Sequence, residues 1–317
     1  MIGCMDTFKD PRQRPFRFGY LAMGGRDTTA RLWLDQARGV EGDGCSTLLV
    51  GDHFLTTMAC TARLPMAAAV TTTLRLGSYV YCNDFRHPAL LAKEAAEIDR
   101  LSDGRLELGL GAGWLKAEYD MVGLPFDEGR VRADRFQEGV GVVTRLLAGE
   151  TVTYHGDHYN LDGYELPAVP VQHPVPLLLG GGGPRMTRFA ARHADIVGFD
   201  PMSLPEGGMD PREFGRPAWE VKLRLVDDAC ADRVDGGPER CILIFHAARR
   251  FDELPEGEDA WVDPQLARDS PYVLVGDPTE MVDTLIERRE RWGLTYYVCF
   301  EQDFDLLRPV VSALAGR

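Results

Sequence analysis

The chain has 317 residues, of which 44% are hydrophobic and 26% charged, the composition of a soluble globular protein with room for a large core. Its 35 Lys and Arg against 49 Asp and Glu give a formal net charge of −14, which argues against nucleic acid or an anionic membrane surface as a partner. There is no apolar stretch near the ~20 residues of a membrane span, no signal-peptide core and no C-x-x-C pair among the seven cysteines, so we expect a cytoplasmic protein with reduced thiols.

Short apolar segments alternate with amphipathic helical patterns in the first half of the chain. A helix is expected from about Thr28, with Asp27 as its N-cap, to the glycines at 42 and 44, and another from Pro88 toward Gly104. The apolar stripe Phe136, Val140, Val143 and Leu147 predicts a third helix. Strands are predicted at 16–21, 47–50, 74–80 and, glycine-rich, from 106 onward.

The second half continues the alternation after one interruption. Residues 151–161 surround a Gly-Asp turn and predict an inserted β-hairpin. A capping box at 277–280 starts a helix that ends at Gly293. Further strands are predicted at 176–179, 196–199, 241–245 and 296–300, and loop insertions near 201–216 and 249–270. Eight strand–helix units without a shift in composition predict one (β/α)₈ TIM barrel over 1–317; an open doubly wound sheet is the alternative, but its phosphate fingerprint is missing after the first strand.

Two glycine clusters stand at strand ends. Gly109, Gly111 and Gly113 alternate before Trp114, which leaves one backbone face bare, either for a flat ligand or for close packing at a barrel corner. The second cluster, 180–183, lies between a strand and a helix that begins at Pro184. Free N–H groups at a helix start bind anions, and Arg185 just inside the helix adds a positive charge. We interpret this loop as a phosphate site rather than as a flexible connection.

Polar residues follow two other predicted strands. His53 comes directly after the strand 47–50, beside Asp52, which could orient its ring for proton transfer. Ser78 and Tyr79 end the third strand. His155 and His158 flank the hairpin turn, where solvated imidazoles are a better interpretation than a metal site, so no metal is expected. Serine-hydrolase and zincin motifs are missing from the sequence.

Taken together, these residues resemble the bacterial luciferase-like superfamily and, within it, the oxidoreductases that use the deazaflavin coenzyme F420. The resemblance runs from Phe16 to about Ala315 and rests on the order and spacing of the segments 52–54, 86–94, 101–114, 180–184 and 190–195. It implies a (β/α)₈ barrel with an insertion that binds a flavin or deazaflavin at the C-terminal ends of its strands.

Carried over position by position, the resemblance assigns a role to each candidate. His53 corresponds to the histidine that faces the redox carbon of the cofactor. Ser78-Tyr79 falls where many members hold a non-prolyl cis peptide against the central ring. The expected catalytic residues are His53 and Asp52, and the expected cofactor-binding residues are Ser78, Tyr79, Gly111, Ala112, Gly113, Trp114, Gly181, Gly182, Gly183 and Arg185.

The sequence also departs from the family. Flavin mononucleotide (FMN) users commonly have Ser or Thr in the phosphate loop, where this chain has glycine and proline, which favours F420 with its less charged phosphate diester. A sugar-phosphate dehydrogenase of this class has glutamate at Trp114 and tryptophan at Thr57, which argues against glucose 6-phosphate and for a larger or less charged substrate. The resemblance thus implies hydride transfer between deazaflavin C5 and a small organic substrate, with His53 as proton donor or acceptor. An FMNH₂-dependent monooxygenase and a non-catalytic flavin-binding protein are the alternatives, and a homodimer is expected.

Overall fold

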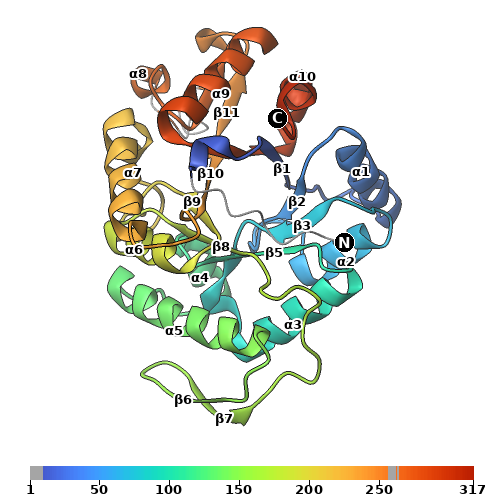
Figure 1. Cartoon of the computed structure of the whole chain (residues 1–317), viewed down its shortest axis with the longest axis vertical. Coiled ribbons are helices and arrows are strands. Elements are labelled where there is room, and N and C mark those ends of the chain that lie inside the picture. The colour runs from blue at the N-terminus through green and yellow to red at the C-terminus, as the bar shows by residue number, and fades with distance from the viewer. Residues whose placement is uncertain (1–9, 256–261, 263) are drawn as a thin grey trace.

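The computed structural model describes residues 10–255, 262 and 264–317, and its centre is a closed barrel of parallel strands with helices around it (Figure 1). Around the ring the strands follow the order β1, β2, β3, β5, β8, β9, β10 and β13, and the pairing of β3 with β5 closes it. Their bounds are β1 (Arg17–Ala22), β2 (Thr47–Val50), β3 (Arg75–Ser78), β5 (Leu106–Gly111), β8 (Leu177–Gly181), β9 (Ile196–Phe199), β10 (Glu239–Ile244) and β13 (Leu294–Phe300). The predicted TIM barrel is confirmed, and the open sheet is wrong.

The helices lie outside the barrel, and α1, α3, α5, α6 and α9 are the ones that the sequence predicted. Their bounds are α1 (Ala30–Gly42), α2 (Cys60–Ala68), α3 (Pro88–Leu101), α4 (Lys116–Val122), α5 (Gly129–Leu147), α6 (Pro184–His193), α7 (Arg216–Cys230), α8 (Pro264–Ala267), α9 (Pro278–Trp292) and α10 (Phe304–Leu314). The capping box of α9 and the left-handed Gly293 at its end are both present. The cap of α1 is Thr29, whose side chain accepts from Leu32 N, and not Asp27. Within the described residues, none of these helices has the length and apolarity that crossing a bilayer requires.

The insertions are only partly as expected. The hairpin pairs β6 (Val152–His155) with β7 (Asn160–Tyr164) and projects beyond α3 and α5 at the bottom of Figure 1. Residues 201–216 contain a Ser203–Met209 bridge and a 3₁₀ turn, Pro211–Phe214. In 249–270 the structure has a 3₁₀ turn, Phe251–Glu253, and α8, while 256–261 and 263 lie outside the described residues. A short pair that the sequence did not indicate, β11 (His246–Ala248) with β12 (Val273–Val275), follows β10.

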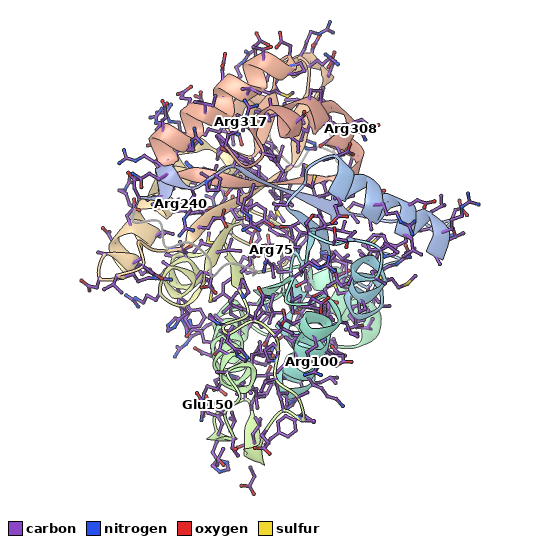
Figure 2. All side chains as sticks on the ribbon, turned by 45° about the vertical axis from the view of Figure 1, so that its right-hand side comes forward. Arg75, Arg100, Glu150, Arg240, Arg308 and Arg317 are labelled. Atoms are coloured by element: carbon purple, nitrogen blue, oxygen red, sulfur yellow. The ribbon has the colours of Figure 1, made fainter. Side chains whose placement is uncertain are left out.

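Charged side chains fill the barrel at the N-terminal ends of its strands. Arg17 on β1 pairs with Glu107 on β5 and lies 2.7 Å from Glu239 on β10, and Arg75 on β3 lies 2.6 Å from Glu107. The Tyr296 hydroxyl donates to Glu107 at 3.2 Å. Figure 2 labels Arg75 beside the barrel strands. Although burial acts to raise the pKa of Glu107, Arg17 and Arg75 outweigh it and hold that pKa below its usual value. This end of the barrel is therefore held by ion pairs.

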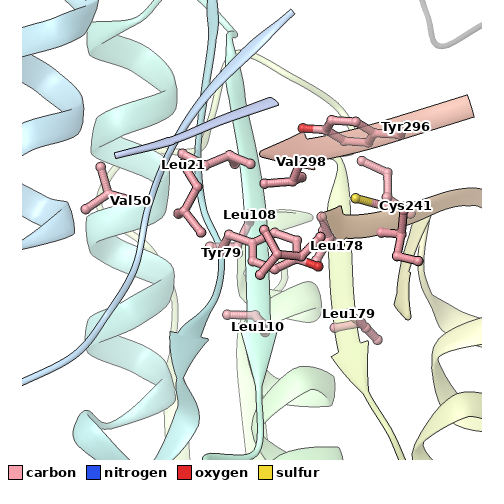
Figure 3. Packing of buried hydrophobic residues seen from close by; sticks show 14 of the residues in the cluster. Leu21, Val50, Tyr79, Leu108, Leu110, Leu178, Leu179, Cys241, Tyr296 and Val298 are labelled. Carbon is pink, nitrogen blue, oxygen red and sulfur yellow. The ribbon is translucent and has the colours of Figure 1, made fainter. Parts of the chain in front are cut away.

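Above the ion pairs the barrel interior is apolar. Leu178 on β8 and Val298 on β13 are buried there and lie near Tyr79 (Figure 3). Tyr79 follows β3, and its hydroxyl points across the barrel toward the side of β8. The ring of Tyr79 therefore forms part of a floor, and the strand ends beyond it are left to shape a site.

Candidate functional site

A cavity of about 920 Å³ opens at the C-terminal ends of the barrel strands. It is the place where TIM-barrel proteins carry their active sites, and its size suits a cofactor ring and a small ligand. The loops after β2, β3, β5, β8 and β9 supply its wall together with the starts of α5 and α6. Of the residues predicted from the sequence, the lining includes Asp52, His53, Tyr79, Gly111, Ala112, Gly113, Trp114, Gly181, Gly182, Gly183 and Arg185.

His53 is held by a carboxylate that the sequence did not reveal. Its Nδ1 lies 2.7 Å from Glu118 Oε2, and Glu118 sits on α4 with only 2% of its side chain exposed. The second oxygen of Glu118 accepts from Leu55 N at 3.1 Å, which fixes the carboxylate. A carboxylate that accepts from Nδ1–H leaves Nε2 as the nitrogen available to a ligand. The imidazole and the Trp114 ring meet edge to face, with ring centroids 6.1 Å apart and an interplanar angle of 83°.

Asp52 does not orient His53, so that expectation is wrong. Its two carboxylate oxygens accept from Arg86 Nη1 and Nη2 at 2.8 and 2.9 Å, and one of them also accepts from Cys82 N at 3.0 Å. A bidentate arginine pair of this kind fixes backbone geometry. Asp52 therefore ties the end of β2 to the loop after β3 and holds His53 in place only through the chain.

The alternating glycines leave space for the chain segment that follows β3. A side chain at Gly109 would meet the Ser78 carbonyl, and one at Gly111 would come within 2.7 Å of Val80. The bare face that was expected beneath a ligand is thus filled by the segment after β3, where the non-prolyl cis peptide joins Tyr79 and Val80 rather than Ser78 and Tyr79. After this peptide, β4 (Tyr81–Cys82) resumes the pairing with β5.

Ser78 is not part of the cavity wall. Its hydroxyl donates to the Gly109 carbonyl at 2.8 Å and accepts from Gly109 N at 3.2 Å, and the residue is buried. It therefore stabilises the pairing of β3 with β5. The expectation that Ser78 contacts the cofactor is corrected by these bonds, because both sides of its hydroxyl are already used within the protein.

The loop 180–183 leads into the start of α6 as the sequence predicted. Gly183 is the N-cap residue, without a side-chain bond to the helix, and Pro184 occupies the first turn, so the N–H groups of Arg185 and Met186 are open at that end. The Arg185 guanidinium lies 2.5 Å from Asp134 on α5 and 2.9 Å from Gln137. A side chain at Gly182 would collide with Pro201, whereas one at Gly183 would meet only Met202 Sδ at 3.9 Å.

Asp200, directly after β9, is a cavity residue that the sequence reading did not select. Its Oδ1 lies 3.5 Å from the Tyr79 hydroxyl, and its Oδ2 occupies the space of a side chain at Gly180, 2.7 Å from where that Cβ would be. Desolvation by burial raises the pKa of Asp200 to about 6, against the opposing effects of Lys222 and Tyr79. Burial likewise raises the pKa of Tyr79 well above its usual value. The tyrosine therefore keeps its proton while Asp200 titrates near neutrality.

The rest of the wall is mostly apolar, with cations confined to one side. Arg130 and Arg132 come from the start of α5 and Arg185 from the start of α6. The Arg132 guanidinium lies 3.9 Å from the Phe126 ring centroid. In the part of the chain that the structure describes, no group of three or more potential ligands suits a metal ion. The cavity thus offers a histidine held by a carboxylate, an apolar slot and a positively charged side.

Comparisons with known proteins agree with this architecture. A sequence profile of the luciferase-like monooxygenase family matches residues 16–210. A relative from Kineococcus radiotolerans named F420-dependent glucose-6-phosphate dehydrogenase is 32% identical over 194 residues, which are 59% of this chain and 57% of that protein. The chain therefore spans less than two thirds of that relative's length.

Two solved structures share the fold over nearly the whole chain. The coenzyme F420-dependent tetrahydromethanopterin reductase from Methanopyrus kandleri superimposes with a TM-score of 0.74 at 18% identity, covering 95% of this chain and 98% of the other. An F420-dependent secondary alcohol dehydrogenase gives a TM-score of 0.72 at 20% identity, covering 94% and 99%. With the barrel and the profile match over more than half of its residues, this chain belongs to the luciferase-like monooxygenase family.

Proposed function

We propose that this protein is an oxidoreductase that uses coenzyme F420 and transfers a hydride between C5 of the deazaflavin and a small organic substrate. The observation that carries the proposal is the His53–Glu118 pair on the wall of an apolar cavity that also contains the open start of α6. The relative named F420-dependent glucose-6-phosphate dehydrogenase and the two F420-dependent neighbours support the choice of cofactor.

The residues of the cavity fit such a cofactor. Its lining is mostly apolar and includes Trp114 and Met202, which suits a flat aromatic system, and the N–H groups at the start of α6 suit a phosphate. Arg130, Arg132 and Arg185 lie on the same side and add positive charge for the anionic end of the molecule. When bound, the deazaflavin would supply the carbon that accepts or releases the hydride.

In this proposal the protein positions the substrate and moves one proton. Glu118 fixes the imidazole through Nδ1, so that Nε2 of His53 removes the proton of a hydroxyl group during oxidation and returns it during reduction. Glu118 also stabilises the positive charge that the ring then carries. The ring of Trp114 packs beside the imidazole in an edge-to-face arrangement.

The test combines binding with a substitution. Intrinsic tryptophan fluorescence is followed while the protein is titrated with F420 and, separately, with FMN. We expect tight binding of F420, and His53→Ala should lower turnover by ~10²–10⁴-fold while the dissociation constant of F420 changes little. Tight binding of FMN alone would overturn the proposal, and so would wild-type turnover in His53→Ala.

The second candidate is an FMNH₂-dependent monooxygenase, which one observation favours. The N–H groups at the start of α6 together with Arg185 would bind the dianionic phosphate of FMN as well as the diester of F420. Oxygen consumption with reduced FMN and a substrate would favour this candidate. The homodimer and the cytoplasmic location expected from the sequence remain predictions.

A further inference from the structure

The cavity has two walls of different character. The outer wall comes from the starts of α5 and α6 and carries Arg130, Arg132 and Arg185. The inner wall comes from the ends of the barrel strands, where Leu21, Tyr79, Asp200, Leu243, Phe245 and Phe300 line it. On this inner wall, within the described residues, the lining has no lysine or arginine. Among these six residues Asp200 carries the carboxyl group, and the other carboxylates of the lining, Asp52 and Glu118, are engaged by Arg86 and His53.

Asp200 and His53 face one cavity from opposite strands. In the closed order β1, β2, β3, β5, β8, β9, β10, β13, the strand before His53 and the strand before Asp200 are four positions apart, half of the ring. Any molecule that reaches Nε2 of His53 from inside the cavity therefore lies between that imidazole and the side of Asp200. The charge of Asp200 acts on the same volume in which the chemistry would occur.

The Asp200 carboxylate keeps hydrogen-bonding capacity for a ligand. It accepts from the backbone N–H of Gly181 and, at 3.5 Å, from the Tyr79 hydroxyl, and a carboxylate with two oxygens can accept about four hydrogen bonds. Lys222 on α7 does not neutralise it at close range, because its Nζ donates to the Asp200 carbonyl at 2.8 Å and pairs with Glu213 at 2.6 Å. The other titratable groups whose charges interact with Asp200 are Tyr79, Cys241 and Tyr272, which are buried.

From this arrangement we infer that Asp200 selects the substrate, so that the inner wall takes an uncharged, largely apolar molecule with a hydroxyl or carbonyl group and rejects anions such as sugar phosphates. The carboxylate accepts a hydrogen bond from an alcohol and, in its protonated form, donates one to a carbonyl. An anion in the same place would meet a like charge in a low-dielectric cavity. The inference rests on the proposed function for its substrate but predicts a charge preference that can be measured without it.

A pair of fluorescent probes isolates that charge preference in the cofactor-free protein. Phenylnaphthylamine is uncharged, and anilinonaphthalene sulfonate adds one negative charge to a similar aromatic skeleton. Binding in the cavity is verified by energy transfer that is lost in Trp114→Phe. At pH 8 we expect the wild type to bind the uncharged probe at least ~10-fold more tightly than the sulfonate.

Two variants give the matched comparison. Asp200→Asn keeps the shape and removes the charge, and we expect it to reduce the preference at least ~3-fold. The control is Asp303→Asn, because burial also raises the pKa of Asp303 to about 6, yet that residue accepts a bond from Ala247 N and does not line the cavity. Asp303→Asn should leave the preference unchanged. Equal preferences in the wild type and Asp200→Asn would overturn the inference.

Activity separates the inference from the proposed function. With F420 bound, the wild type should oxidise an uncharged cyclic secondary alcohol such as cyclohexanol with a higher kcat/KM than glucose 6-phosphate, and Asp200→Asn should raise KM for the alcohol. Preferential oxidation of glucose 6-phosphate would overturn the inference and leave the proposed function standing. Absence of F420 binding, with the probe preference as expected, would overturn the proposed function and support the inference.

Discussion

Replacing Asp200 with asparagine should stabilise the protein, and the gain should depend on pH. The side chain occupies the space beside Gly180, and burial raises its pKa from 3.8 to about 6. A carboxyl whose pKa is raised on folding favours the folded state while it is protonated, below the unfolded pKa. That advantage is lost as the pH rises through the folded pKa. Asparagine has the same shape but no charge, so its burial lacks the cost of desolvating an ionised carboxylate.

The size of the effect follows from the shift of about 2 pKa units. Each unit corresponds to about 1.4 kcal/mol, so Asp200→Asn should raise the free energy of unfolding by about 3 kcal/mol at pH 8 and by about half of that at pH 5. For a chain of 317 residues the gain at pH 8 corresponds to a Tm increase of about 4 °C. Urea unfolding followed by circular dichroism at both pH values measures it.

Asp303→Asn provides an independent check of the same reasoning. Burial raises the pKa of Asp303 to about 6, and its bond from Ala247 N can be kept by an asparagine oxygen. It should therefore stabilise the protein with the same pH trend. An equal gain at pH 5 and pH 8 in Asp200→Asn, or a loss of stability at pH 8, would refute the argument that a buried charge is the cause.

Three further predictions test other parts of the structure. Glu118→Ala leaves Nδ1 of His53 and Leu55 N without their acceptor, so kcat should fall by ~10–100-fold with little change in F420 affinity. Steady-state kinetics and fluorescence titration measure the two quantities, and an unchanged kcat would contradict the role of the pair. Glu107→Ala leaves the Arg17 charge buried without its main partner and should cost about 3–5 kcal/mol in urea unfolding, so a cost below 1 kcal/mol would show that the ion pairs at that end do not hold the barrel. Gly183→Asp puts a carboxylate at the open start of α6, where it should raise Tm and weaken F420 binding at least ~10-fold. Gly183→Ala is the control, and weaker binding in both variants would mean that the added volume, and not the charge, is responsible.

The barrel could be predicted from the sequence because its signals are local. Apolar runs, the Asp277 capping box and the Gly293 stop each depend on residues a few positions apart. The third strand was predicted as continuous because Tyr79 and Val80 are as apolar as their neighbours, and a cis peptide leaves no mark in composition. The insertion at 151–161 was recognisable from its turn residues, although β7 extends to Tyr164.

The site could be predicted only where one residue stands at a strand end. His53 and the loop at 180–183 were found in this way, because both lie directly after apolar strands. The partner of His53 was missed because Glu118 lies 65 positions along the chain on a short helix that the sequence reading did not predict. Asp200 also follows a predicted strand directly, so it could have been selected in the same way as His53. Its burial and its contact with Tyr79 could not be predicted, because they depend on strands that are far apart in the sequence.

The hairpin has a consequence for the cavity, although it projects away from the barrel. Glu138 on α5 accepts bonds from the backbone N–H groups of Asp157, His158 and Tyr159 at 3.1 to 3.3 Å, and Gly156 leaves room for that carboxylate. One turn earlier on the same helix, Asp134 and Arg135 reach Arg185 and Asp84. Because an α-helix is stiff over such a distance, the hairpin helps to fix the first turn of α5, which lines the cavity with Arg130 and Arg132. Shortening it should change how fast a bound cofactor leaves, without altering the chemical step.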